Sequence, residues 1–267
     1  MTLFHFLSYG FIERAYLAGS FIAVLCAMLG MFLVLRKLSL IGDGLSHVSF
    51  GAIALGLFFG FYPFYVAVPV VILASLLILK LTQKAKIYGD AAIGIVSSVG
   101  IAGGVILASL SRGFNVDLFS YLFGNILAIS YQEVYLSVGL SLLVLGIIVF
   151  LFHDLFSATF DEEYARVSGI KTEQINVIVI VLTAIAVVLA IKVVGVMLVS
   201  ALLILPAVTA LQLAKGFKTA MIIAIIVSVA SVLLGITASF FLDLSAGATI
   251  VMLNALFFVL AFIWKKI

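Results

Sequence analysis

The feature that most constrains this 267-residue chain is a series of apolar stretches, each long enough to cross a lipid bilayer. A membrane-spanning helix needs about 20 mostly apolar residues. About nine such stretches follow one another, separated by short turns that carry charges, glycine or proline. The expected spans are residues 15–35, 44–60, 63–81, 91–110, 132–152, 174–191, 193–212, 217–241 and 246–264. We therefore expect an all-α, polytopic membrane helical bundle with about eight or nine transmembrane helices.

The composition supports a membrane protein. The chain is 66% hydrophobic and 9% charged, with a mean hydropathy of +1.44, whereas a soluble domain carries about 25% charge. No stretch has the composition of a separate soluble domain, so we expect one transmembrane domain over residues 1–267. The net charge of +3 is too small and too dispersed to suggest binding to nucleic acid. The single cysteine, Cys26, cannot form an intrachain disulfide and is expected to pack between helices. The first ten residues lack the basic region and cleavage site of a signal peptide.

Basic residues predict the orientation, because lysine and arginine stay preferentially on the cytoplasmic side of a membrane. If the first span runs inward, three basic residues fall outside, namely Arg14, Arg112 and Lys192. The other basic residues all fall inside: Arg36, Lys37, Lys80, Lys84, Lys86, Arg166, Lys171, Lys215, Lys218, Lys265 and Lys266. This split predicts an external N-terminus and a cytoplasmic C-terminus. The turn at Lys192 leaves almost no loop, so two short helices or one broken helix are expected there.

Two ionisable residues, Asp43 and His47, lie at the start of the second expected span. Residues four apart share one helix face, so the carboxylate and the imidazole are expected to lie side by side. An ionisable residue inside a membrane segment costs about 2.5 to 3.5 kcal/mol on insertion scales, which favours a functional role for the pair. Carboxylate and imidazole are common ligands of zinc. The pair therefore predicts part of the route of a metal ion.

Structural roles also fit this pair. Asp43 would then be the N-cap of the second span, accepting hydrogen bonds from free backbone amides, and His47 would bond to a neighbouring helix. Depth is a further question, because Asp43 follows Lys37 by only six residues. This spacing places Asp43 nearer the inner face than the midplane unless the preceding segment is itself buried.

Small residues at helical spacing predict close contacts between helices, because lipid offers helices no hydrophobic drive to associate. These small residues are Gly51, Ala52, Ala54, Gly94, Gly100, Gly103, Gly104 and Ala108. Most of the 22 glycines are therefore expected to serve packing alone.

Two places depart from the pattern of regular spans: Pro206 and the segment of residues 111–130. Pro206 removes one helical hydrogen bond and predicts a kink or break, with Ser200 and Thr209 available to satisfy the freed backbone groups. Such a helix either lines a transport pathway or is only bent, and the sequence favours neither. Residues 111–130 form a shorter, more polar segment that is expected to be a surface helix or a re-entrant piece.

One cytoplasmic segment, residues 153–174, is the longest expected stretch between spans on the inner side. Within it the chain is expected to form a short helix, with acids in its first turn and a glycine just beyond its end. The residues of this segment are Asp161, Glu162, Glu163, Tyr164, Ala165, Arg166, Val167, Ser168 and Gly169. A helix that lies on the negative inner leaflet is usually basic, so this acidic helix predicts a protein partner. An ordinary solvated linker is the alternative.

Several motifs are absent from the sequence. It has no phosphate-binding loop with a Gly-Lys pair, so any ATP that drives transport must bind another subunit. It also lacks the H-E-x-x-H protease motif, the G-x-S-x-G nucleophile elbow and a CxxC pair. An intramembrane enzyme is therefore not expected, and no permanently bound cofactor is predicted.

Five stretches of the sequence carry a resemblance to a known family. They are LRKLSLIGDGLSHVSFGAIALGL (35–57), DLFSYLFGNILAIS (117–130), ARVSGIK (165–171), KVVGVMLVSALLILPAVTA (192–210) and DLSAGATIV (243–251). In this order, over nearly the whole chain, they resemble the membrane permeases of zinc and manganese uptake ABC transporters, the ZnuB-like family. Several long motifs in register are more specific than any single pattern.

The resemblance implies an integral, multi-pass permease of the prokaryotic cell membrane with a fold similar to that of the vitamin B12 importers. It implies a homodimer, two cytoplasmic ATPase subunits and an extracytoplasmic metal-binding protein that delivers the ion. Asp43 and His47 match the family's G-D-x-x-x-H motif, which that family places in the translocation pathway. The segment around Asp161 to Gly169, within residues 154–172, corresponds to the helix that couples the permease to the ATPase.

The sequence leaves alternatives for the transported ion and for the class of membrane protein. Zinc is the favoured ion and manganese or iron the alternative, because imidazole and carboxylate ligands serve more than one metal. Asp117, Glu133 and Asp243 are expected either to guide a cation or contact the binding protein, or to be ordinary loop charges. An ATP-independent secondary transporter is the main rival, but such carriers often have two related halves and the Asp/His motif occurs once. A purely structural membrane subunit is the second rival.

Overall fold

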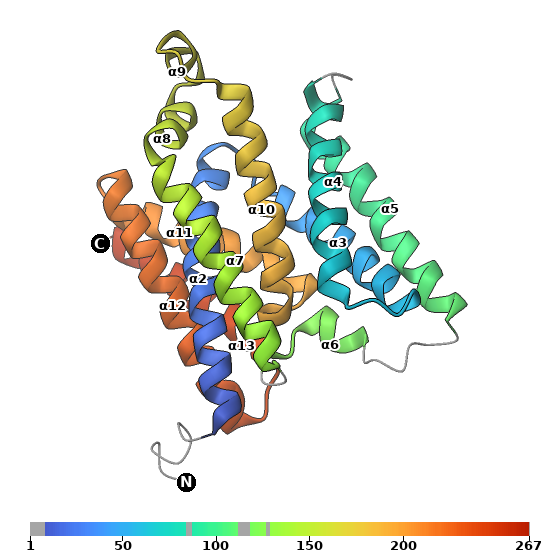
Figure 1. Cartoon of the computed structure of the whole chain (residues 1–267). Coiled ribbons are helices and arrows are strands. Elements are labelled where there is room, and N and C mark those ends of the chain that lie inside the picture. Colours follow the sequence, from blue (N-terminus) through green and yellow to red (C-terminus); the bar gives the residue numbers. More distant parts are fainter. Residues whose placement is uncertain (1–8, 84–86, 112–117, 127–128, 267) are drawn as a thin grey trace.

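The computed structural model describes residues 9–83, 87–111, 118–126 and 129–266 (Figure 1). Within these ranges nine helices are long and apolar enough to cross a membrane, which confirms the predicted all-helical bundle. They are α2 (Gly10–Leu35), α3 (Ile41–Phe58), α4 (Pro63–Gln83), α5 (Gly89–Leu110), α7 (Tyr131–Phe150), α10 (Thr172–Val194), α11 (Val199–Leu213, which reaches spanning length with the 3-10 helix before it, Val196–Leu213), α12 (Phe217–Leu242) and α13 (Ala246–Lys266). The ends of each helix lie within about six residues of the ends of its predicted span. Hydropathy locates the apolar part of a span, whereas the helix can continue into the polar residues beside it.

In the described part of the chain, four shorter helices lie between the spanning helices. They are α6 (Leu118–Phe123), α8 (Phe152–Phe160), α9 (Glu162–Val167) and the 3-10 helix η2 (Val196–Leu198). In Figure 1, α8 and α9 project at one end of the bundle and α6 lies at the opposite end. We call these the α9 end and the α6 end. Helix α8 is not among the predicted elements, because residues 153–160 belong to the expected cytoplasmic segment, in which a helix is predicted only at the acidic part.

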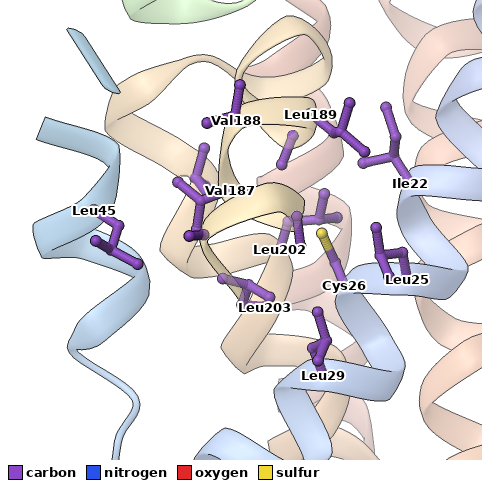
Figure 2. Close-up of a cluster of buried hydrophobic side chains, with 14 of the residues drawn as sticks. Ile22, Leu25, Cys26, Leu29, Leu45, Val187, Val188, Leu189, Leu202 and Leu203 are labelled. Atoms are coloured by element: carbon purple, nitrogen blue, oxygen red, sulfur yellow. The ribbon is translucent and has the colours of Figure 1, made fainter. Parts of the chain in front are cut away.

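The core lies where α2 packs against α10 and α11 (Figure 2). Helix α2 contributes Ile22, Leu25, Cys26 and Leu29, all fully or almost fully buried. Facing residues come from the middle of α10 and the first turns of α11: Val187, Val188, Leu189, Leu202 and Leu203. Cys26 packs in this core as a small apolar side chain, as predicted. Because α2 also contacts α7 and α12, it is the central helix around which the others are arranged.

Helices α3 and α5 approach each other closely through the predicted small residues. A side chain at Gly51 would overlap the backbone of Gly100, and one at Gly100 would lie 2.7 Å from the Cα of Val48. Gly94 and Gly103 have no neighbour within 4 Å of an added Cβ, so those positions serve no contact inside the described chain. The close pair therefore holds the helix that carries Asp43 and His47 against α5.

The break in the second half lies at Gly195 and not at Pro206. Helix α11 runs without interruption from Val199 through Pro206 to Leu213, so the predicted break at the proline is wrong. Gly195 has φ +81°, and a side chain there would overlap the backbone of Gly124, which itself has φ +75°. This contact between two backbones ends α10 and places the start of α11 inside the bundle.

The segment that contains α6 packs onto this break. Tyr121 and Ile126 are buried, and the side chain of Ile126 reaches α2 beside Gly19. Residues 112–117 and 127–128 lie outside the described part of the chain. The described part of segment 111–130 thus contains a six-residue helix, which is far too short to span a membrane.

Candidate functional site

Asp43 and His47 lie on α3, and their side chains meet as the four-residue spacing predicted. Asp43 belongs to the first turn of α3, and His47 lies one turn further on. The Nε2 atom of His47 is 3.7 Å from Oδ2 of Asp43. Leu40, and not Asp43, is the N-cap residue of α3, and no side chain caps this helix. The structure therefore does not support the simple capping role for Asp43.

A third polar residue, Ser200 in the first turn of α11, completes this group. Its hydroxyl donates a hydrogen bond of 3.0 Å to Oδ1 of Asp43. Helix α3 starts from the α9 end and α11 starts from the α6 end, yet their first turns meet (Figure 1). Asp43 therefore lies between the two ends of the bundle and not at one face. The carboxylate thus joins the first turn of α3 to the first turn of α11.

One ring nitrogen of His47 forms no hydrogen bond with the described residues. Its Nδ1 atom is buried and has no hydrogen-bond partner among the described residues. The predicted alternative, a hydrogen bond from His47 to a neighbouring helix, is thus not seen at this atom. About 25% of the His47 side chain and 50% of the Asp43 side chain are exposed in the single chain. The pair is therefore accessible from one side, where an ion or another chain can approach.

The geometry of the pair fits one metal ion held between its two side chains. Two ligands about 2.1 Å from a tetrahedral ion lie roughly 3.4 Å apart, close to the 3.7 Å measured between Nε2 and Oδ2. No cluster of three or more His, Cys, Asp or Glu side chains occurs in the described ranges. A tetrahedral ion at this pair would therefore need further ligands from water, from other spans or from a second chain.

Glu133 belongs to a separate group of charged residues and not to the Asp43–His47 pair. Glu133, at the start of α7, is 2.7 Å from Lys192 in the last turn of α10, and only 9% of its side chain is exposed. It also forms a capping box with Ser130, and the ring of Tyr121 lies 4.8 Å from the ammonium group of Lys192. This group ties α6, α7 and α10 together at the α6 end, which favours a structural role for Glu133.

Asp243 and Asp117 are the other two acids singled out from the sequence. Asp243 is exposed at the end of α12 and has φ +53°. Asp117 lies outside the described residues. Neither position adds a ligand to the Asp43–His47 pair in the described structure.

The acidic segment at the α9 end has the predicted form. Asp161 is the N-cap of α9, and its Oδ1 accepts a hydrogen bond of 2.8 Å from the backbone N–H of Tyr164. Gly169 ends the turn with φ +88°. Tyr164 and Val167 are 67% and 88% exposed, whereas Ala165 is fully buried. The helix therefore presents an aromatic and an aliphatic side chain outward at the tip of the molecule (Figure 1).

Ser200 is the site residue that sequence reasoning missed. Its hydroxyl was assigned to a backbone group freed by Pro206, whereas it bonds to a carboxylate 157 positions away in the sequence. Thr209 donates to the carbonyl of Leu205, four residues earlier, whereas Pro206 frees the carbonyl of Leu202. The only signal for Ser200 was a hydroxyl early in an otherwise apolar span, which does not name its partner.

Comparison with known proteins identifies the family of the chain. A family model described as the ABC 3 transport family matches residues 8–265. The manganese transport system membrane protein MntC of Halalkalibacterium halodurans is 33% identical over 97% of this chain and 89% of its own length. The high-affinity zinc uptake system membrane protein ZnuB of Haemophilus influenzae is 34% identical over 92% of this chain and 95% of its own.

A solved structure shows the same architecture. The structure of PsaBC from Streptococcus pneumoniae in complex with Fab matches with a TM-score of 0.87 and 30% identity. The match covers 96% of this chain and 92% of the other chain. The family model, the relatives and the fold agree over almost the full length. The chain therefore belongs to the ABC 3 transport family, as a multi-pass membrane permease of bacterial metal-ion importers.

Proposed function

We propose that this permease carries a divalent metal ion into the cytoplasm and that the ion passes between Asp43 and His47. The observation that carries this proposal is the meeting of a carboxylate and an imidazole, 3.7 Å apart, in the interior of an apolar bundle. The same helix buries apolar side chains next to the pair in sequence, namely Leu45 and Val48. A divalent cation would compensate the carboxylate and use the free electron pair of a neutral imidazole.

The proposed assembly contains two copies of this chain, two cytoplasmic ATPase subunits and an external metal-binding protein. The incomplete ligand set supports a homodimer, because a second copy would supply another carboxylate and imidazole across a two-fold axis. The exposed helix α9 supports ATPase docking through Asp161 to Gly169, and no ATP site is expected in this chain. This assignment places the α9 end and the C-terminus in the cytoplasm, in agreement with the distribution of basic residues.

Zinc is the proposed substrate, with manganese and iron as the alternatives. Imidazole and carboxylate ligands bind zinc more tightly than manganese or iron(II) in the usual order of affinities. The relatives do not separate these ions, since one is named for manganese and another for zinc. A site with few protein ligands also suits transit, because an ion held by a complete cage leaves slowly.

The proposed cycle is alternating access driven by the ATPase subunits. The loaded binding protein docks at the α6 end, and ATP binding closes the two ATPases at the α9 end. The ion then meets an ionised Asp43 and a neutral His47, with Ser200 holding one carboxylate oxygen. Membership of an ABC permease family argues against the ion-coupled secondary transporter.

Uptake of radioactive zinc, manganese or iron by proteoliposomes that contain the complete transporter tests this proposal. Asp43→Asn and His47→Gln keep the size of each side chain and remove a metal ligand. We expect each to lower ATP-dependent uptake by more than about tenfold, because one ligand is worth over 1.4 kcal/mol. Ser49→Ala is the matched control, since Ser49 lies on the same helix and only donates to the carbonyl of Leu45. Normal uptake by both ligand variants would refute the pathway.

A further inference from the structure

Arg36, the residue that ends α2, holds together four helices at the α9 end. Its Nε atom donates a hydrogen bond of 2.8 Å to Oγ1 of Thr159 on α8. Its Nη1 atom donates one of 2.7 Å to Oδ1 of Asn176 on α10. Asn176 in turn donates a bond of 3.3 Å to Oε1 of Glu162, the first residue of α9. A single guanidinium thus connects α2 to the whole acidic segment.

This placement differs from that of an ordinary interfacial basic residue. The neighbouring Lys37 is exposed, whereas Arg36 turns inward between helices. Burial lowers the pKa of Arg36, and the charge of Glu162 opposes that effect. A planar guanidinium forms two directed bonds at once, which a lysine ammonium does not reproduce. The geometry therefore depends on arginine and not only on positive charge.

The backbone between Arg36 and Asp43 forms a tight, hydrogen-bonded turn. Backbone hydrogen bonds join Leu38 to Leu33, Ile41 to Leu38 and Gly44 to Leu40 across the turn between α2 and α3. Asp43 lies seven residues after Arg36, inside the first turn that these bonds define. A displacement of the Arg36 side chain is therefore passed through a tight turn to the start of α3.

There is also room for such a displacement. A cavity of about 450 Å³ lies beside the guanidinium, and its walls include Arg36, Ile41, Thr82, Thr159 and Glu162. The cavity separates the turn from α4 and α5, so the turn can shift without displacing closely packed atoms. The Nη2 atom of Arg36 has no hydrogen-bond partner among the described residues, which leaves one donor free for a second arrangement.

A second contact, which does not involve Arg36, also holds α8. Phe152, Phe156 and Phe160 of α8 pack around Phe217 at the start of α12, with ring centroids 5.2 to 5.9 Å apart. This aromatic cluster holds α8 in place without Arg36. A substitution of Arg36 is therefore expected to leave the segment folded and able to dock on an ATPase.

We propose that Arg36 is a positioning residue that transmits the movement of α8 and α9, imposed by the ATPase, to the turn before α3 and so to Asp43 and His47. This inference rests on the proposed function, because it takes α9 as the ATPase contact. It adds to that function the residues that connect the ATPase contact with Asp43 and His47. The link passes from Glu162 through Asn176 and Arg36.

The first test measures metal uptake and ATP hydrolysis together in proteoliposomes that contain the complete transporter, with radioactive zinc as the probe. For Arg36→Gln and Asn176→Leu we expect normal assembly and basal hydrolysis, but about tenfold less zinc transported per ATP hydrolysed, a usual size for coupling between sites. Arg36→Lys should recover only part of the loss. Lys37→Asn is the control, because it removes a neighbouring charge and suits the positive φ of 58°. Uptake per ATP at the wild-type value in Arg36→Gln would overturn the proposal, as would an equal loss in Lys37→Asn.

A second measurement does not depend on the transported ion. Spin labels on Leu40→Cys and Leu213→Cys, both exposed positions near the α9 end, report the position of the start of α3 relative to α11. Cys26 is buried, so the labels react with the introduced cysteines. An ATP analogue should change this distance in the otherwise wild-type complex and leave it unchanged with Arg36→Gln. An equal change in both overturns the link, whereas absence of metal uptake by wild type overturns only the proposed function.

Discussion

At the scale of single residues, the account depends on a carboxylate, an imidazole and a hydroxyl that three turns of two helices bring together. Asp43 accepts one hydrogen bond from Ser200 and faces the imidazole of His47 with its other oxygen. The hydroxyl holds one carboxylate oxygen, so the second oxygen stays turned toward His47 and the proposed route of the ion. Holding a ligand in place by an outer partner is a common way to tune metal affinity.

Removal of the Ser200 hydroxyl tests this positioning role. A hydrogen bond to a charged group is worth about 1.5 to 3 kcal/mol when buried, and less at the half-exposed Asp43. We expect Ser200→Ala to lower zinc uptake about three- to tenfold, without the near-complete loss expected for Asp43→Asn. Thr209→Val is the control on α11, because its hydroxyl only contacts the carbonyl of Leu205. Equal uptake by Ser200→Ala and wild type would show that Asp43 needs no such support.

At the scale of elements, the ends of α6, α7 and α10 are joined by a nearly buried ion pair. Lys192 and Glu133 are 2.7 Å apart, with 17% and 9% of their side chains exposed. Removing one partner of such a pair leaves an uncompensated charge and costs about 3 to 5 kcal/mol. We expect Glu133→Gln to lower the thermal unfolding temperature of the detergent-solubilised permease by roughly 10 °C.

The double variant Glu133→Gln with Lys192→Met separates a charge effect from a packing effect. It removes both charges and should recover most of the lost thermal stability. If the double variant is as unstable as the single one, the contribution of this pair is packing or hydrogen bonding to Ser130 and not compensation of charge.

The junction of α10 and α11 provides a second test at this scale. Gly195→Ala forces a side chain into φ +81° and into the backbone of Gly124. This extended conformation with positive φ is essentially restricted to glycine and costs another residue about 1 to 3 kcal/mol, and the overlap adds to it. We expect a clear fall in the yield of folded permease and in its unfolding temperature. Gly139→Ala has no neighbour within 4 Å of the added Cβ and should be harmless. Equal stability of the two variants would contradict the close contact at the break.

These elements show what the sequence can and cannot predict. Hydropathy located the nine spans, and the charge pattern located α9, because both signals are local in sequence. The break near Lys192 was anticipated, but its cause was not, since the contact of Gly195 with Gly124 joins distant segments. The pairing of Asp43 with His47 followed from helix geometry. The partners Ser200 and Arg36 were missed in their actual roles, because hydrogen bonds across 120 residues or more leave no spacing pattern.

At the scale of the whole molecule, one chain forms a bundle that offers two ligands to the proposed metal site. In Figure 1 the two ends of the bundle are marked by α9 and α6. The α9 end carries the acidic segment and the α6 end the buried ion pair, and Asp43 lies where the first turns of α3 and α11 meet. A second copy that approaches the accessible side of the pair would bring the ligand number from two to four, as zinc prefers. The proposed homodimer thus follows from ligand number, and the ATPase link through Arg36 follows from hydrogen bonds at one end.

The most direct test of the central claim is X-ray absorption spectroscopy of zinc bound to the purified transporter complex. We expect oxygen and imidazole ligands at about 2.0 to 2.2 Å, with two imidazoles per zinc ion if both protomers contribute. The imidazole signal should disappear in His47→Gln and persist in His153→Gln, a variant on α8 far from the pair. A spectrum without imidazole, or one that His47→Gln leaves unchanged, would contradict the claim that Asp43 and His47 hold the metal ion in transit.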